Sequence, residues 1–88
     1  MSNAAYAATA ADSIIVAAQG NASMIEIHYH SGDAGFLGFG EPGVVDQGIK
    51  ISASAPYYKI GPGDPRLLQA IHMICDGAGS QAGGYQIS

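Results

Sequence analysis

Charge is scarce in this sequence, and positive charge most of all. Charged residues make up 11% of the 88 residues, against about 25% in ordinary soluble domains. Lys50, Lys59 and Arg66 are the only basic side chains, too few for the basic patch that phosphate recognition requires, so we expect no binding to nucleic acid. Because 48% of the residues are apolar, a lone monomer would expose much uncharged surface, and we expect other copies or another protein to cover it.

Cysteine and long apolar runs are equally scarce. Cys75 is the only cysteine, so the chain cannot form an internal disulfide, and we interpret this residue as a buried small hydrophobe. No segment reaches the roughly 18 apolar residues of a membrane span, so we expect no membrane association. The alanine-rich start, Ala4 to Ala11, has no Lys or Arg before it, as a signal peptide would, which indicates synthesis in the cytoplasm.

Short β-forming segments between glycine and proline turns are what the sequence has in abundance. In residues 23–30 apolar and polar side chains alternate, which is typical of a half-buried strand and puts His28 and His30 on its polar face. About seven such segments predict an all-β fold, a single small antiparallel β-sandwich or barrel. Besides residues 23–30, strands are expected at residues 13–18, 34–40, 48–53, 57–60, 70–75 and 81–87.

Local signals complete this outline. Residues 1–11 have no apolar stripe at helical spacing, so we expect either a flexible, extended arm or a first edge strand, ahead of a sandwich domain at residues 12–88. A turn is expected at residues 19–21. Asp64 and Pro65 suit the cap and the first position of a short helical turn.

His28 and His30 are the sharpest candidates for chemistry. Histidines two residues apart on a strand share a face, and neutral imidazole is a common metal ligand. His72 from another strand, with Glu26 or an Asp, would complete a metal site. The alternative is that this polar face contacts water or a neighbouring subunit, and we favour it, so no cofactor is predicted.

Other reactive side chains do not suggest an active site. His72 and Cys75 lie three residues apart in a strand and therefore on opposite faces. Residues 35–40 have the glycine spacing of a phosphate loop, but Pro42 and Gly43 follow where a helix would have to begin. We therefore predict that the chain is not an enzyme.

A resemblance to a known class of proteins rests on three segments. These are Phe36-Leu37-Gly38-Phe39-Gly40-Glu41-Pro42, Gly48-Ile49-Lys50-Ile51 and Tyr57-Tyr58-Lys59-Ile60. Together they resemble the small β-sandwich virion structural proteins of tailed bacteriophages. The resemblance implies a capsid decoration (cement) protein, a head-fibre base or another small virion component, commonly oligomeric, and it transfers no catalytic residue.

The resulting expectation is a phage virion structural protein that stabilises the capsid surface as a homotrimer. Its partner would be the major capsid protein or another virion protein. We expect the contacts to come from the N-terminal arm and its surroundings (Tyr6, Ile14 and Ile15) and from an edge formed by Tyr57 and Tyr58.

A small carbohydrate- or receptor-binding module is the alternative function, with a tail-associated virion component as a further one. Tyr57, Tyr58 and Tyr85 would supply a sugar-binding platform, since sugars stack on aromatic faces. Adjacent Tyr57 and Tyr58 point to opposite faces of a strand, so only one of them can face a ligand. A core or interface role is the commoner one for such tyrosines.

Overall fold

The computed structural model describes residues 2–18 and 22–88, which include eight strands and one short 3-10 helix, η1. The predicted all-β class is confirmed, and the turn expected at residues 19–21 lies outside the described residues. The elements are β1 (Ser2–Ala8), β2 (Ser13–Val16), β3 (Ile25–Gly32), β4 (Gly35–Phe39), β5 (Ile49–Ile51), β6 (Tyr57–Ile60), η1 (Pro65–Leu68), β7 (Ile71–Cys75) and β8 (Gln81–Ile87).

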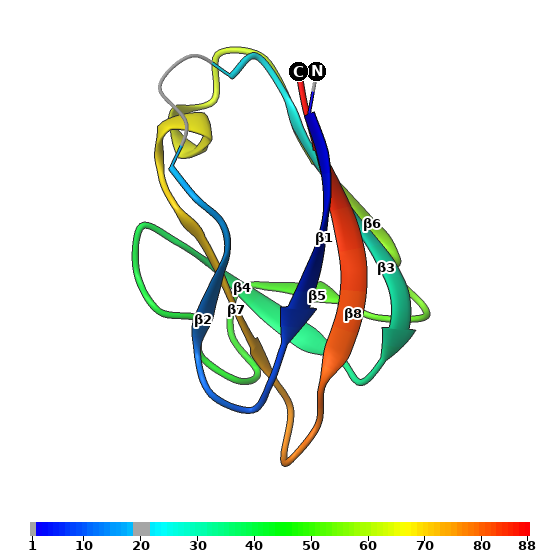
Figure 1. Cartoon of the computed structure of the whole chain (residues 1–88). Helices are drawn as coiled ribbons and strands as arrows, with labels where there is room; N and C mark the ends of the chain where they lie inside the picture. The colour runs from blue at the N-terminus through cyan, green and yellow to red at the C-terminus, as the bar shows by residue number, and fades with distance from the viewer. Residues whose placement is uncertain (1, 19–21) are drawn as a thin grey trace.

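The strands form two antiparallel sheets that pack face to face (Figure 1). The first sheet has the strand order β1-β8-β3-β6, and the second sheet has the order β2-β7-β4-β5. No described strand belongs to both sheets, so the fold is a sandwich and not a barrel. β1 lies antiparallel to β8, which brings the two ends of the chain together at one end of the sandwich (Figure 1).

Alternation along the strands decides which side chains fill the space between the sheets. Ile25 and Ile27 on β3 are fully buried, as the period of two predicted. Ile71, Met73 and Cys75 on β7 are also fully buried. Cys75 is therefore the buried hydrophobe that was expected, and burial raises the pKa of its thiol.

Residues 2–8 are part of the sandwich as β1, so for this segment the structure corrects the expectation of a flexible arm over residues 1–11 and a domain beginning at residue 12. β1 pairs with β8 along its whole length without a register shift. Tyr6 and Ala8 point inward, with 6% and 1% of their surface exposed. The edge strand, the alternative that the sequence left open, is the arrangement observed, and backbone pairing with β8 stabilises it without an apolar stripe.

A chain of hydrogen bonds crosses the core from Tyr6 to the second sheet. The Tyr6 hydroxyl donates to Oε1 of Gln81 at 2.6 Å, and Gln81 is only 2% exposed. Nε2 of Gln81 donates to the backbone oxygens of Ile51 on β5, at 2.9 Å, and of Asp33 in the turn after β3, at 2.8 Å. Because each of these buried polar groups has a partner, the network connects β1 and β8 to the second sheet without an unsatisfied group.

This network predicts a loss of stability at high pH that depends on Tyr6. Burial raises the pKa of Tyr6 to about 12, above the ordinary value of about 10. A raised pKa in the folded state contributes stability that is complete below pH 10 and is lost as the pH rises towards 12, about 2–3 kcal/mol in all. Tyr6→Phe has no such ionisation, so the difference in unfolding free energy between the two proteins should shrink from pH 9 to pH 12. A difference that stays constant would contradict the prediction.

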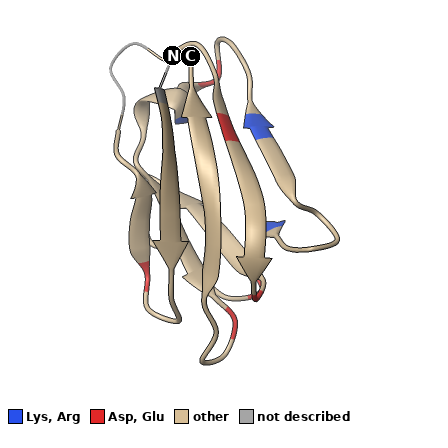
Figure 2. Ribbon diagram, turned by 45° about the vertical axis from the view of Figure 1, so that its right-hand side comes forward, with Lys and Arg blue, Asp and Glu red and all other residues tan. Residues whose placement is uncertain are grey.

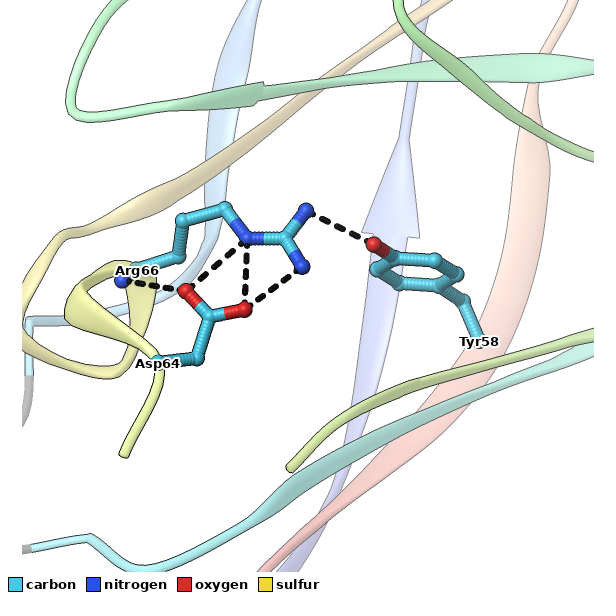
Figure 3. A network of polar contacts seen from close by, with 3 residues as sticks. All are labelled: Tyr58, Asp64 and Arg66. Atoms are coloured by element: carbon cyan, nitrogen blue, oxygen red, sulfur yellow. Dashed lines mark hydrogen bonds and ion pairs between the residues drawn. The ribbon is translucent and has the colours of Figure 1, made fainter. Parts of the chain in front are cut away.

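The Arg66 side chain connects η1 to the neighbouring strands β6 and β4. Asp64 caps η1 by accepting the N–H of Arg66 at 2.9 Å, with Pro65 at the first position as predicted. The Arg66 guanidinium contacts the Asp64 carboxylate at 2.7 Å and donates to the Tyr58 hydroxyl at 2.7 Å (Figure 3). It also lies 4.8 Å from the centre of the Phe39 ring. The hydrogen bonds between Arg66 and Asp64 raise the pKa of Arg66 and lower the pKa of Asp64. The guanidinium is therefore already paired with a carboxylate of its own domain.

The connection between β4 and β5, residues 40–48, folds back against the outer side of the second sheet. A Cβ added to Gly43 would lie 2.7 Å from the backbone oxygen of Phe36, and Phe36 is only 5% exposed. Asp12 holds this connection in place, because Oδ1 accepts the Gly43 N–H at 2.8 Å while Oδ2 lies 2.9 Å from Nδ1 of His72. The chain thus covers part of its own second sheet, whereas no described segment folds over the outer face of the first sheet.

Candidate binding surface

The outer face of the first sheet is built by the register of four strands. Ala5 on β1 lies opposite Gly84 on β8. Gly84 lies opposite His28 on β3, which in turn lies opposite Tyr57 on β6. Alternation from these positions defines the outer face, whose residues are Asn3, Ala5, Ala7, Glu26, His28, His30, Tyr57, Lys59, Ala82, Gly84 and Gln86.

A shallow, open hollow of about 390 Å³ lies across β1, β8 and β3. Ala5 has a small side chain and Gly84 has none, so the surface is recessed there between the larger side chains of neighbouring residues. Imidazole and amide groups at the hollow can donate and accept hydrogen bonds, so it can contact small polar groups of a partner. The residues that line it are Asn3, Ala4, Ala5, His28, His30, Gly84, Tyr85 and Gln86.

His28 and His30 share the outer face, as the alternation predicted, but their rings lie against different neighbours. The ring centre of His28 lies 4.8 Å from that of Tyr57 on β6. The His30 ring lies over β8, since a Cβ added to Gly84 would be 3.3 Å from its Cε1. His72, considered as a third ligand, is on the second sheet. Among the described residues, no group of three or more His, Cys, Asp or Glu side chains is placed to hold a metal ion.

Tyr57 is the exposed aromatic residue of this face. Its surface is 46% exposed, and its hydroxyl donates a hydrogen bond to Oε1 of Glu26 on β3. This hydrogen bond to a carboxylate raises the pKa of the Tyr57 hydroxyl. Tyr57 therefore contacts both Glu26, through its hydroxyl, and His28, through its ring, and these two contacts hold it at the edge of the face.

The five residues predicted to contact a partner lie in different environments. Tyr6 and Ile15 are in the core, 6% and 7% exposed, because strand alternation and the bulge of β2 turn them inward. Tyr58 is half-buried and packs against the core. Ile14 is 58% exposed but lies on the second sheet, whereas Tyr57 lies on the first. The structure does not bring these five residues together on one surface, and it places Tyr6 and Ile15 inside the domain.

The sugar-binding platform considered from the sequence is not formed. Tyr57 and Tyr58 point to opposite faces of β6, as expected, and Tyr85 packs against the core. The other pair weighed from the sequence also separates as expected. Cys75 is fully buried, whereas His72 lies on the outside of β7 and contacts Asp12.

The part of this face on β1 and β8 was not predicted from the sequence. Asn3, Ala5, Gly84 and Gln86 lie there because β8 is paired between β1 and β3. On β8 the outward positions are Ala82, Gly84 and Gln86, and the inward positions are Gln81, Gly83, Tyr85 and Ile87. Both faces contain glycine and glutamine, so polarity alone does not tell them apart along most of the strand. This surface is identified by the register in which β1 pairs with β8, and these two strands lie at opposite ends of the sequence.

No helix in the described part of the chain is long and apolar enough to cross a membrane. Comparison with known protein families, with curated proteins and with solved structures gave no match to this chain. The fold defines the class of the protein as a small antiparallel β-sandwich. Its function is therefore argued from the open face of the first sheet.

Proposed function

We propose that this chain is a structural protein of a tailed-bacteriophage virion that binds the capsid surface as an oligomer and stabilises it. The resemblance of its glycine-rich and tyrosine-containing segments to small virion proteins supports this proposal. The mechanism is non-covalent binding without catalysis, in which each copy docks on neighbouring shell subunits. Repetition over many copies converts weak contacts into stable attachment.

The observation that carries the proposal is the uncharged outer face of β1 and β8. Residues 2–8 and 81–87 contain no charged side chain, and Figure 2 shows the two neighbouring strands free of charge along their length. The nearest charges on this face are Glu26 on β3 and Lys59 on β6. Charged residues are depleted at the centres of protein interfaces and are abundant on surfaces that stay in water. An open, uncharged face with only a shallow hollow is therefore suited to a protein partner.

Ala82→Glu tests this docking surface. Ala82 is exposed on the outer face of β8, opposite Ala7 on β1, so the fold should tolerate the change. A carboxylate there would be buried without a partner on docking, and we expect binding to shells assembled from the major capsid protein of the same phage to weaken roughly tenfold or more. Co-sedimentation with the shells measures this binding.

Ala78→Glu is the matched control, because Ala78 is exposed in the turn between β7 and β8, away from the face. It should bind like the wild type. Equal binding by both variants would place the docking surface elsewhere. A wild-type protein that does not bind shells at all would overturn the proposed function.

A second candidate function, binding of a carbohydrate or host receptor, is favoured by the hollow and by Tyr57, whose ring lies against that of His28. The imidazoles of His28 and His30 offer hydrogen bonds to sugar hydroxyls, and Tyr57 offers an exposed aromatic ring. A glycan-array signal that is lost in Tyr57→Ala, from a wild type that does not bind shells, would favour this function.

A further inference from the structure

β1 is an edge strand without the features that normally keep an edge from pairing. Its seven residues include no proline and no charged residue, and they pair with β8 without a bulge. No described strand pairs with its other edge. Natural sheets protect open edges with charges, proline, bulges or very short strands. Because β1 has none of these, its open edge is available to another strand.

The other three edges of the sandwich are each protected. β6 has four residues, follows Pro56 directly and contains Lys59. β5 has only three residues and contains Lys50. β2 has four residues and a register shift between Ile14 and Val16. The chain therefore protects three edges and leaves one open.

The alternation of hydrogen bonds in the first sheet shows which groups of β1 face this open edge. The N–H of Tyr29 donates to the oxygen of Pro56, on the β6 side, at 2.8 Å. The neighbouring residue, His28, therefore turns its N–H and C=O to β8, where it lies opposite Gly84. Gly84 faces β3 in return, so Ala5, on the other side of Gly84, turns its own N–H and C=O to the open edge. By the same alternation, Asn3 and Ala7 also face the open edge.

We infer that β1 pairs antiparallel with β1 of a second copy, about a two-fold axis at Ala5. With Ala5 opposite the same residue of the second copy, Asn3 lies opposite Ala7 on both sides of the axis. Every edge-facing residue from Asn3 to Ala7 then has a partner, which gives about six backbone hydrogen bonds. Tyr6 lies opposite Ala4, so inward-facing side chains stay on the inner face and outward-facing ones on the outer face.

The lack of charge in β1 is what makes identical strands compatible. About a two-fold axis the central residue meets its own copy, so a Lys or Glu at position 5 would face a like charge. Ala5 instead brings two methyl groups together. A ring of three copies built by strand pairing would need β1 to meet a different edge, and the other three edges are protected. Strand pairing therefore favours two copies over the trimer expected from the sequence.

This pairing would join two first sheets into one continuous sheet, in the order β6-β3-β8-β1-β1-β8-β3-β6. The uncharged outer face of β1 and β8 would double in area, with Glu26 and Lys59 on strands farther from the axis. The role of this doubled face in binding shells rests on the proposed function. The dimer itself does not depend on that function.

Light scattering on a size-exclusion column, with the untagged full chain, tests the pairing. The wild type is expected at twice 8.9 kDa. Ala5→Pro is expected to be a monomer, because proline removes an N–H that faces the open edge and none that bonds to β8. Ala5→Lys is also expected to be a monomer, because two ammonium groups would meet at the axis. Ala82→Lys, on the same outer face but one strand away from the edge, is the matched control and should remain a dimer.

A wild type that stays monomeric from micromolar to millimolar concentration would overturn the inference, and so would a dimer that persists in both Ala5 variants. A mass of three copies would also overturn it and would support the trimer. Circular dichroism checks that each variant is folded, and Ala5→Lys keeps the test decisive if Ala5→Pro does not fold. Since shell binding is measured separately with Ala82→Glu, a failure of the dimer and a failure of the proposed function are distinguishable.

Discussion

Tyr6→Ala is expected to lower the free energy of unfolding by about 3–5 kcal/mol, the cost of truncating a buried aromatic side chain. Tyr6 is 6% exposed, and its hydroxyl donates to Gln81, which is itself buried. The substitution leaves a cavity and also removes the donor from Oε1 of Gln81. A domain of 88 residues has a total stability of about 4–13 kcal/mol, so a large part of it would be lost. Urea unfolding followed by far-ultraviolet circular dichroism measures the change.

Tyr57→Ala is the matched control for this prediction. Tyr57 is 46% exposed and makes its hydrogen bond to Glu26 on the surface, so its truncation should cost less than about 1 kcal/mol. Equal losses in the two variants would mean that the Tyr6 ring contributes no more to stability than a surface tyrosine. Such a result would favour the flexible arm, and it would also remove the basis for pairing through β1.

The contrast between these two tyrosines shows what the sequence can and cannot predict about the fold. Alternation in residues 23–30 predicts both the existence of β3 and its buried face, because Ile25, Ile27 and Tyr29 occupy every second position and therefore share one face. Asp64 and Pro65 likewise predict where η1 begins. β1 consists mostly of alanine, and alanine does not indicate which face of a strand is buried. Its position is decided by pairing with β8, at the far end of the chain, and no local pattern records that contact.

The candidate surface is predictable only strand by strand. Alternation places His28 and His30 on one face correctly, but it does not say which strands lie beside them. The pairing of β3 with β8 on one side and β6 on the other brings Gly84 and Tyr57 next to His28. Tyr6 and Ile15, predicted as contact residues, lie in the core for a related reason. An apolar residue in a short strand fits the core and an interface equally well until the opposing sheet is placed.

Gly83→Ala is expected to cost about 3 kcal/mol or more, because the substitution overfills a closely packed position between two strands. A Cβ at Gly83 would overlap the backbone oxygen of His28 and would lie 2.6 Å from Cζ and the hydroxyl oxygen of Tyr6. The His28 oxygen belongs to the pairing of β3 with β8, so it cannot move away without breaking that ladder. Displacing the Tyr6 ring would break its hydrogen bond to Gln81. Neither the His28 oxygen nor the Tyr6 ring can therefore move without a loss of stability.

Gly84→Ala, one residue farther along β8, separates this crowding from the general effect of adding a methyl group to a strand. Gly84 faces outward, and an added Cβ would lie 3.3 Å from both the Ala4 oxygen and Cε1 of His30. The exposed His30 side chain can move by the few tenths of an ångström required, so the change in unfolding free energy should stay within about 1 kcal/mol. Urea midpoints of the two variants at the same pH give the comparison. A small loss in both would mean that β1 and β3 can move apart around Gly83, and the Tyr6 ring would then not be fixed between the sheets.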